Sequence, residues 1–373
     1  MNTRIVVGMV AAGLFAVGCG KKKAEEGKEP PVTNPGSGSA TAGSGSAAGS
    51  GAAAGSGSAA DSGSAAAAAP DPKLMERGEY LAKTFGCPVC HVYFDEKGPD
   101  FSKRGGGGLE IPEKFGTWRG PNISSHKGTG IGNWTVEHIM AAIREGVRPD
   151  GSKLYPIMPY PNYNRMTDAD ALALATFIKN LPEVDHLVAP NKDLKLPQIP
   201  VPKPENKPDE VGDPVKHGEY LVTIMHCNNC HAKAGKDGMP DMTKGYSGGL
   251  AFEIPFLGTG TLYASNITSD PDTGIGKWTE ADIIKALKTM TRPDGSMIMG
   301  PMQFYQAGWS QMTDQDLAAV AAYVKAIPAD KNKVPKSNFK PAGPPPGAGG
   351  PPGAGGPPAS GSGSAAGPGS AAK

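Results

Sequence analysis

The sequence predicts an all-α protein made of two tandem copies of one small helical domain, joined by a proline-rich linker and flanked by disordered segments. Three observations support this prediction. A short cysteine–histidine motif occurs at residues 87–91 and again at residues 227–231. A much longer internal repeat surrounds both motifs at a nearly constant spacing. Segments of low complexity, rich in Gly, Ala, Ser and Pro, precede and follow the repeat, and such segments do not form a packed core.

Both motifs have the form Cys-x-x-Cys-His, which is typical of covalent c-type haem attachment. Each thiol adds to one vinyl group of the porphyrin, and the next residue then lies against the haem face, where an imidazole binds the iron as the proximal ligand. The sequence therefore predicts two covalently attached haem c groups. Their attachment and proximal residues are Cys87, Cys90, His91, Cys227, Cys230 and His231.

Two other uses of paired cysteines fit the sequence poorly. A four-cysteine zinc ribbon places its pairs about 15 to 20 residues apart, whereas these pairs are 140 residues apart. A redox-active disulfide requires a βαβ context, which neither motif has. Neither alternative explains the histidine that follows both pairs.

Residues 1–18 are predicted to be a lipoprotein signal peptide. Arg4 supplies the positive start, and the apolar stretch that follows is too short to span a bilayer. The segment ends in Ala16, Val17, Gly18 and Cys19, which resembles a bacterial lipoprotein signal, so Cys19 is the expected lipidation site. Residues 19–70 continue as a Gly/Ser/Ala-rich flexible tether. An ordinary signal peptide with a chance cysteine is the alternative.

The first domain is expected over residues 71–186 and contains three helices. Pro72 suits a first turn, and a helix over 73–84 leads into the motif. A second helix is predicted over 135–146 with Thr135 as N-cap, and a third over 167–180 with Thr167 as N-cap. Residues 95–123 are rich in glycine and are expected to form loops.

The second domain, over residues 213–330, repeats the first. The spacing between matching residues is 140 through both motifs, 144 from Asn266 onward and 146 from Met312 onward. Residues 187–212 are a semi-rigid proline-rich linker, and residues 331–373 are predicted to be a disordered Pro/Gly-rich tail. Tyr80 with Phe177, and Tyr220 with Tyr323, are expected where the first and last helices of each domain cross.

The second axial iron ligand is expected to be a methionine at matching places in both domains. Met158 lies ten residues after Arg148, and Met302 lies ten residues after Arg292. Each has a proline beside it, which stiffens the loop that presents the sulfur. Met297 and Met299 remain alternatives to Met302. The matching pair Met166 and Met312 precedes a capped helix and is expected in the core.

Several other repeated residues have two possible roles. Trp134 and Trp278 either donate to haem propionates or are core aromatics. Arg148 and Arg292 either pair with propionates or sit as cations at a helix C-terminus. The histidines outside the motifs do not match between the domains, and His226, which aligns with Gly86, is expected on the surface.

At this point a family resemblance is evident. Both domains resemble class I cytochrome c: an N-terminal helix, the attachment motif, loops, and a distal methionine before a C-terminal helix. Residues 122–168 are also similar to the cytochrome subunits of membrane-bound alcohol and gluconate dehydrogenases, in which Asn-Ile-Thr, Thr-Gly-Ile-Gly-x-Trp and Arg-Pro-Asp-Gly recur before Met-Pro. Those subunits usually carry three haem motifs, whereas this chain has two.

The resemblance implies a non-enzymatic carrier of single electrons between redox partner proteins, namely a dehydrogenase, an oxidase or a quinol-oxidising complex. It also implies export, so we expect a lipid-anchored protein that faces the periplasm. Lys plus Arg number 37 and Asp plus Glu number 36, and this balance gives no support to nucleic-acid binding. The alternatives are a haem enzyme, peroxidase-like or oxidase-like, with one open iron site, and an electron-wire subunit inside a dehydrogenase complex.

Overall fold

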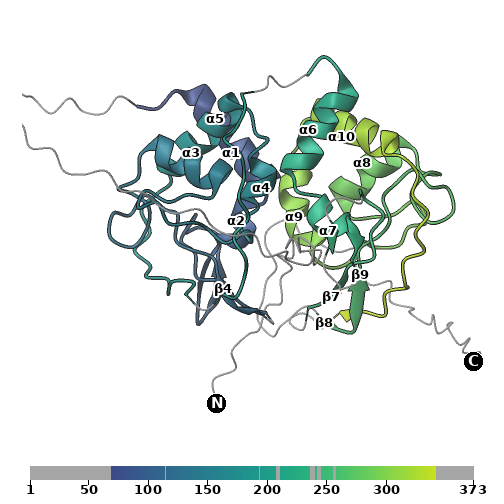
Figure 1. The fold of residues 1–373 in the computed structure, drawn as a ribbon, viewed down its shortest axis with the longest axis horizontal. Helices are drawn as coiled ribbons and strands as arrows, with labels where there is room; N and C mark the ends of the chain where they lie inside the picture. Colours follow the sequence, from purple (N-terminus) through teal and green to yellow (C-terminus); the bar gives the residue numbers. More distant parts are fainter. Residues whose placement is uncertain are drawn as a thin grey trace, which may run out of the picture. The chain divides into compact units, whose positions relative to one another are not determined.

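The computed structural model describes residues 69–341, apart from 114, 193, 207–210, 236–239, 242–244 and 255–257. The predicted signal peptide, Cys19, nearly all of the tether and residues 342–373 lie outside the described residues. The described part contains ten helices and five two-stranded antiparallel sheets (Figure 1). The helical prediction is confirmed, and the small sheets are an addition to it. None of the helices in the described part is long and apolar enough to cross a bilayer.

The first half has five helices whose ends follow from their capping residues. Asp71 accepts a hydrogen bond from the backbone N–H of Lys73, and Thr135 and Thr167 cap the helices that follow them. The three predicted helices are therefore confirmed to within about one residue. In chain order the helices are α1 (Pro72–Thr84), α2 (Cys87–Cys90), α3 (Val136–Glu145), α4 (Tyr160–Tyr163) and α5 (Asp168–Lys179).

The second half repeats this order. Thr279 and Thr313 occupy the N-cap positions that Thr135 and Thr167 hold in the first half. The fourth helix differs, because it has eight residues where the first half has four. The helices are α6 (Pro214–Ile224), α7 (Asn228–His231), α8 (Glu280–Thr289), α9 (Met302–Trp309) and α10 (Asp314–Ala326).

Glycines set the packing of the first helix against the last in each half. A Cβ atom at Gly78 in α1 would lie 2.1 Å from the carbonyl oxygen of Ala173 in α5. A Cβ atom at Gly218 in α6 would lie 2.0 Å from the carbonyl oxygen of Ala319 in α10. The two backbones therefore approach as closely as they do because neither glycine has a side chain. Phe177 and Tyr323 lie at these crossings as predicted, since their Cβ atoms would be 2.5 and 2.7 Å from the added Cβ atoms, whereas the hydroxyls of Tyr80 and Tyr220 bond to the opposite half.

The glycine-rich stretch predicted as loops contains two short hairpins. In the first half β1 (Tyr93–Asp95) pairs with β2 (Gly98–Asp100), and β3 (Glu110–Glu113) pairs with β4 (Gly116–Arg119). Ile111 faces Trp118 across the second hairpin, and both side chains are buried. Glycine and proline content alone did not reveal these strands. The second half has the pairs β5 (Lys233–Ala234) with β6 (Pro240–Asp241), β7 (Ala251–Glu253) with β9 (Thr261–Tyr263), and β8 (Gly258–Thr259) with β10 (Lys340–Pro341).

The proline-rich linker is extended and lies against the first half. The Tyr160 hydroxyl donates to the carbonyl of Ile199 at 2.9 Å and accepts from the Ile199 N–H at 3.0 Å. The Lys195 N–H donates to the carbonyl of Phe115, and Leu194 is buried. These bonds give the linker one path over the surface.

Part of the predicted disordered tail is also ordered, and this is a correction. Residues 331–341 run back along the second half and end in β10. The Asn332 side-chain amide donates to the carbonyls of Ser247 and Gly248, the side chain of Asn338 accepts from the Thr261 N–H, and Phe339 packs on the β7–β9 hairpin. Asparagine side chains thus hold this segment by hydrogen bonds to the backbone of the second half. The amino-acid composition of the tail does not predict such bonds.

Both halves belong to one compact unit in the described part of the chain. One continuous apolar core contains side chains from α1, α3 and α5 and from α6, α8 and α10. Two smaller clusters lie at the hairpins, one in each half. The halves contact each other mainly through α1 with α9 and through α4 with α6.

Candidate haem sites

The first motif forms one short turn of helix directly after α1. Gly86 adopts a left-handed conformation with φ of 74°, and this reverses the chain between α1 and α2. The His91 N–H then donates to the carbonyl of Cys87 at 3.0 Å, which places the histidine next to both cysteines. Cys87 and Cys90 form no disulfide and are half-buried. The second motif has the same turn, with the His231 N–H bonded to Cys227 at 2.9 Å.

Each motif histidine is held by one ring nitrogen. His91 Nδ1 lies 2.9 Å from the carbonyl oxygen of Pro121, and His231 Nδ1 lies 2.8 Å from the carbonyl oxygen of Ser265. A carbonyl oxygen only accepts hydrogen bonds, so Nδ1 carries the proton in both rings. In a neutral imidazole this leaves Nε2 with a free lone pair, and a second bond of this kind commonly orients histidines that bind metal.

Burial fixes the protonation of these side chains. Burial lowers the pKa of both His91 and His231, and the hydrogen bond to the carbonyl raises it by a smaller amount. The net lowering favours the neutral form of the imidazole, which is the form that binds metal. Burial also raises the pKa of the four motif thiols to about 12. The cysteines are therefore protonated at neutral pH, unlike the thiolates that coordinate metal ions.

One methionine in each half packs against the same apolar core as the first cysteine of its motif. Met158 packs against the main core together with Cys87, and Met302 packs against the same core together with Cys227. The set of two thiols, one imidazole with a free Nε2 and one thioether on a shared apolar core fits a covalently bound haem.

The loop before each methionine is built in the same way in both halves. The Arg148 N–H bonds to the Ser152 carbonyl at 2.8 Å, and the Arg292 N–H bonds to the Ser296 carbonyl at 2.9 Å. Each arginine side chain then donates to a carbonyl one residue further on, at Lys153 or Met297. These arginines therefore brace the methionine loop, a role that the sequence did not predict.

This common loop sets the alignment of the methionines. The Leu154 N–H bonds to Gly146, and the Ile298 N–H bonds to Met290, both at 2.7 Å. Counting forward four residues from Leu154 and Ile298 reaches Met158 and Met302. Met299 instead aligns with Tyr155 and packs with Cys230 at the β7–β9 hairpin, and Met297 is 46% exposed. Met166 and Met312 are buried core residues, as predicted.

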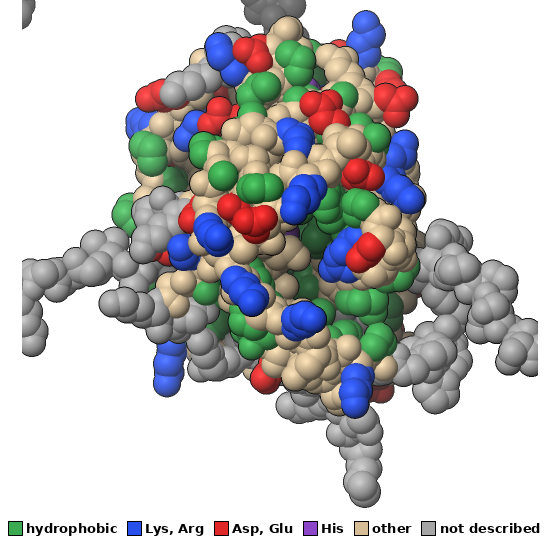
Figure 2. Space-filling model, turned by 90° about the vertical axis from the view of Figure 1, so that its right-hand side faces the viewer, with side chains coloured by type: hydrophobic (Ala, Val, Ile, Leu, Met, Phe, Trp, Pro, Cys, Tyr) green, Lys and Arg blue, Asp and Glu red, His purple; other side chains and the backbone are tan. Residues whose placement is uncertain are grey.

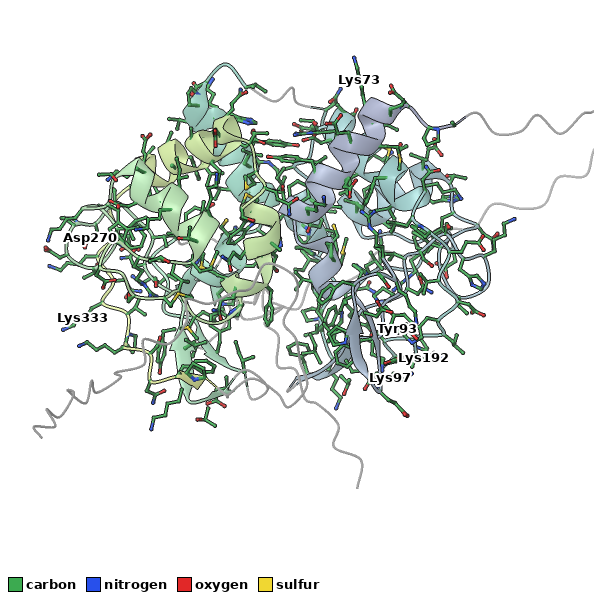
Figure 3. The ribbon with its side chains drawn as sticks, turned by 180° about the vertical axis from the view of Figure 1, so that it is seen from behind. Lys73, Tyr93, Lys97, Lys192, Asp270 and Lys333 are labelled. Carbon is green, nitrogen blue, oxygen red and sulfur yellow. The ribbon has the colours of Figure 1, made fainter. Side chains whose placement is uncertain are left out.

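The tryptophans and one further histidine have structural roles. Trp134 and Trp278 are partly buried against the main core, which supports the core-aromatic interpretation. Asp270, labelled in Figure 3, lies on the loop between β9 and α8, where its carboxylate accepts hydrogen bonds from the N–H and hydroxyl of Thr273. His126 aligns with Asp270 and likewise bonds the N–H and hydroxyl of Thr129. His126 is thus a loop anchor.

His226 was wrongly expected on the surface. Its ring lies between two tyrosines, with ring centroids 6.2 Å from Tyr163 and 5.7 Å from Tyr305. Burial lowers the pKa of His226 to about 4 and raises the pKa of both tyrosines well above the usual value. The sequence held one signal, because a non-glycine residue replaces Gly86 immediately before the second motif.

Comparison with known proteins agrees with this geometry. The family model for cytochrome c matches residues 215–328. A dihaem c-type cytochrome of Cereibacter sphaeroides is 31% identical over 270 residues, which are 68% of this chain and 86% of that protein. The chain belongs to the cytochrome c family. The resemblance seen in the sequence is therefore confirmed.

This cytochrome is also similar to subunits of larger enzymes. The alcohol dehydrogenase (quinone) cytochrome c subunit of Gluconobacter oxydans is 36% identical over 69% of the chain, and the fructose dehydrogenase cytochrome subunit of Gluconobacter japonicus is 32% identical over 73%. The chain spans 56% of the length of each of these two relatives. Both relatives are named as the cytochrome subunit of a dehydrogenase.

The outer face of the second half carries both hydrophobic and charged side chains. Figure 2 shows hydrophobic side chains gathered in a recess on this face, with Lys and Arg side chains along its border. Acidic side chains are interspersed among the basic ones (Figure 2).

Proposed function

We propose that this cytochrome carries two covalently bound haem c groups and passes single electrons between redox proteins. One observation carries the proposal: in both halves the motif histidine donates Nδ1–H to a backbone carbonyl and so keeps Nε2 free. When bound, haem supplies a one-electron iron couple.

The residues of the chain have distinct tasks in this proposal. Cys87 and Cys90 tether the first haem, and Cys227 and Cys230 tether the second. His91 and His231 would bind the iron of a haem held there, and Met158 and Met302 would supply its second ligand. A thioether ligand would leave no open position for small molecules and would raise the potential. The arginine-braced loop holds each sulfur in place without taking part in electron transfer.

The partner and location belong to the same proposal. The dehydrogenase subunits among the relatives support a dehydrogenase as electron donor, in a complex or as a separate protein. Cys19 is the proposed lipid anchor, and the protein would then face the periplasm at a membrane surface. No substrate binds iron in this proposal, so the protein is not an enzyme.

Haem counting combined with axial-ligand spectroscopy tests the function. The protein is produced with a haem-attachment system and fully oxidised. Haem is counted as its pyridine complex. The weak long-wavelength absorption band from methionine-to-iron charge transfer is then measured per haem. We expect two haems and two bands' worth of intensity. Two haems with one band's worth, together with carbon monoxide binding to the reduced protein, would favour an open-site enzyme. A Met166→Leu variant, which changes a core methionine, is the control and should retain both bands.

A further inference from the structure

The segments that carry the two motifs meet in the interior of the protein. His226 directly precedes Cys227, and its backbone has φ of 48°, in the left-handed region that glycine Gly86 occupies in the first half. A histidine is uncommon in this conformation and costs free energy there. Glycine would suit the turn, so the turn itself does not explain the histidine.

The side chain of His226 reaches from the second motif to the first. Its ring lies edge-on to Tyr163 of α4, and its interaction with the Phe85 backbone affects its pKa. Phe85 is two residues before Cys87, and its ring is 5.8 Å from Tyr163. A side chain adjacent to one attachment site therefore touches the segment adjacent to the other.

Tyr305 makes the same connection from the opposite side. Its ring packs so closely on Gly86 that a Cβ atom there would lie 2.3 Å from it. The hydroxyl is near enough to both motifs for all four thiols to affect its pKa. One tyrosine of α9 thus lies between the two attachment sites.

Contacts around these rings hold them in place. Trp309, stacked on Tyr305 at 5.2 Å, donates its indole N–H to the carbonyl of Thr84 at 3.0 Å. The side-chain amide of Asn162 donates to the carbonyl of Thr223 at 3.1 Å and to the side chain of Asn228 at 2.9 Å. Each half therefore fastens its fourth helix to the motif region of the other.

We propose that Tyr163, His226 and Tyr305 form an aromatic bridge that couples the two haem sites and carries an electron between them. The inference rests on the proposed function. One electron leaves the reduced site and enters the oxidised site, so one iron is oxidised as the other is reduced, and no bond or proton is exchanged. The tyrosines keep their hydroxyl protons, because burial disfavours the phenolate.

The test measures how fast an electron redistributes between the sites in the full-length protein carrying both haems. A Met158→His background makes the first haem bis-histidine and lowers its potential, which separates the two haems spectrally. After a flash that reduces the protein, the electron passes to the second haem, and absorbance follows this phase. In this background we expect Tyr305→Leu and His226→Gly to slow the phase severalfold. Tyr305→Phe, which keeps the ring, should retain the rate.

Tyr80→Phe is the matched control, because it weakens a contact between the halves away from the bridge. It should leave the rate unchanged, while the haem count and both potentials are measured in every variant. The bridge is refuted by two attached haems and unchanged rates in Tyr305→Leu and His226→Gly. Equal slowing in Tyr80→Phe would also refute it, because general loosening would then be the cause. Fewer than two haems in the wild-type protein would overturn the proposed function and the bridge together.

Discussion

The hydroxyl of Tyr220 in the second half donates to the carboxylate of Asp170 in the first half at 2.8 Å. The reverse contact is also present, because the Tyr80 hydroxyl donates to the carboxylate of Asp316. Both aspartates belong to the first turn of the last helix in their half. The two halves therefore clasp each other through equivalent residues, as expected of two copies of one fold related by an approximate twofold axis.

Each aspartate is also held by its own half. Arg77 donates two hydrogen bonds to Asp170, at 2.8 and 2.9 Å, and His217 Nε2 lies 2.8 Å from Asp316. Both carboxylates are nearly buried. Removing the tyrosine hydroxyl therefore costs free energy, because the charged carboxylate loses one of its hydrogen-bond donors.

The contact between Tyr220 and Asp170 should stabilise the folded protein measurably. We expect Tyr220→Phe to lower the free energy of unfolding by about 1.5 to 3 kcal/mol, the usual range for a hydrogen bond to a charged group. Urea unfolding of the haem-loaded protein measures this change. A double-mutant cycle with Asp170→Asn isolates the pair, and strictly additive effects of the two substitutions would show that the contact contributes nothing.

Tyr80 should make the protein sensitive to alkaline pH. Burial, together with the hydrogen bond to Asp316, raises the pKa of Tyr80 to about 12 from an ordinary value of 10.0. The folded state holds this proton more tightly, so its contribution to stability is full below pH 10 and is lost as the pH rises through 12. We therefore expect the stability difference between the wild type and Tyr80→Phe to shrink over this interval. Urea midpoints at several pH values measure it, and a constant difference would contradict the assignment.

Sequence patterns predicted the elements that depend on nearby residues. Thr135 and Thr167 predicted the helices that follow them, because an N-cap side chain accepts a hydrogen bond from an N–H group only three residues away. The repeat likewise located the motifs and the core methionines. The reciprocal contacts of Tyr220 with Asp170 and of Tyr80 with Asp316 were not predicted, and neither were the contacts among Tyr163, His226 and Tyr305. These residues meet only after both halves have folded and docked. His226 was misplaced for the same reason, since its partners lie in α4 and α9.

The packing role of the two crossing glycines could not be predicted from the repeat. Gly78 and Gly218 match each other, yet a matching glycine in a helix does not reveal which backbone will approach it. The repeat predicted Phe177 and Tyr323 at the crossings, but it did not predict that they would pack against these glycines.

Alanine at either crossing glycine should separate the helices. Alanine favours an isolated helix by about 1 kcal/mol relative to glycine, but at Gly78 its methyl group would overlap the Ala173 carbonyl. We expect Gly78→Ala and Gly218→Ala each to lower the free energy of unfolding by about 1 to 3 kcal/mol, as overpacking usually does. Gly212, which has open space around it, is the matched control. Thermal or urea unfolding measures the stability of each variant and of the control. Unchanged stability in both variants would mean that the helices move apart without a loss of free energy.

The last prediction separates the three methionines of the second half. The arginine-braced loop aligns Met302 with Met158, whereas Met299 aligns with Tyr155 and Met297 is at the surface. We expect Met302→Ala to remove half of the methionine-to-iron band intensity while both haems stay attached through their cysteines. Met297→Ala should leave the band intact. Met299→Ala should lower stability by about 2 kcal/mol or more through lost packing at the hairpin, and it should also keep the band. Retention of the full band in Met302→Ala, with its loss in Met299→Ala, would move the ligand to Met299 and would show that the longer α9 changes the position from which the second half presents its sulfur.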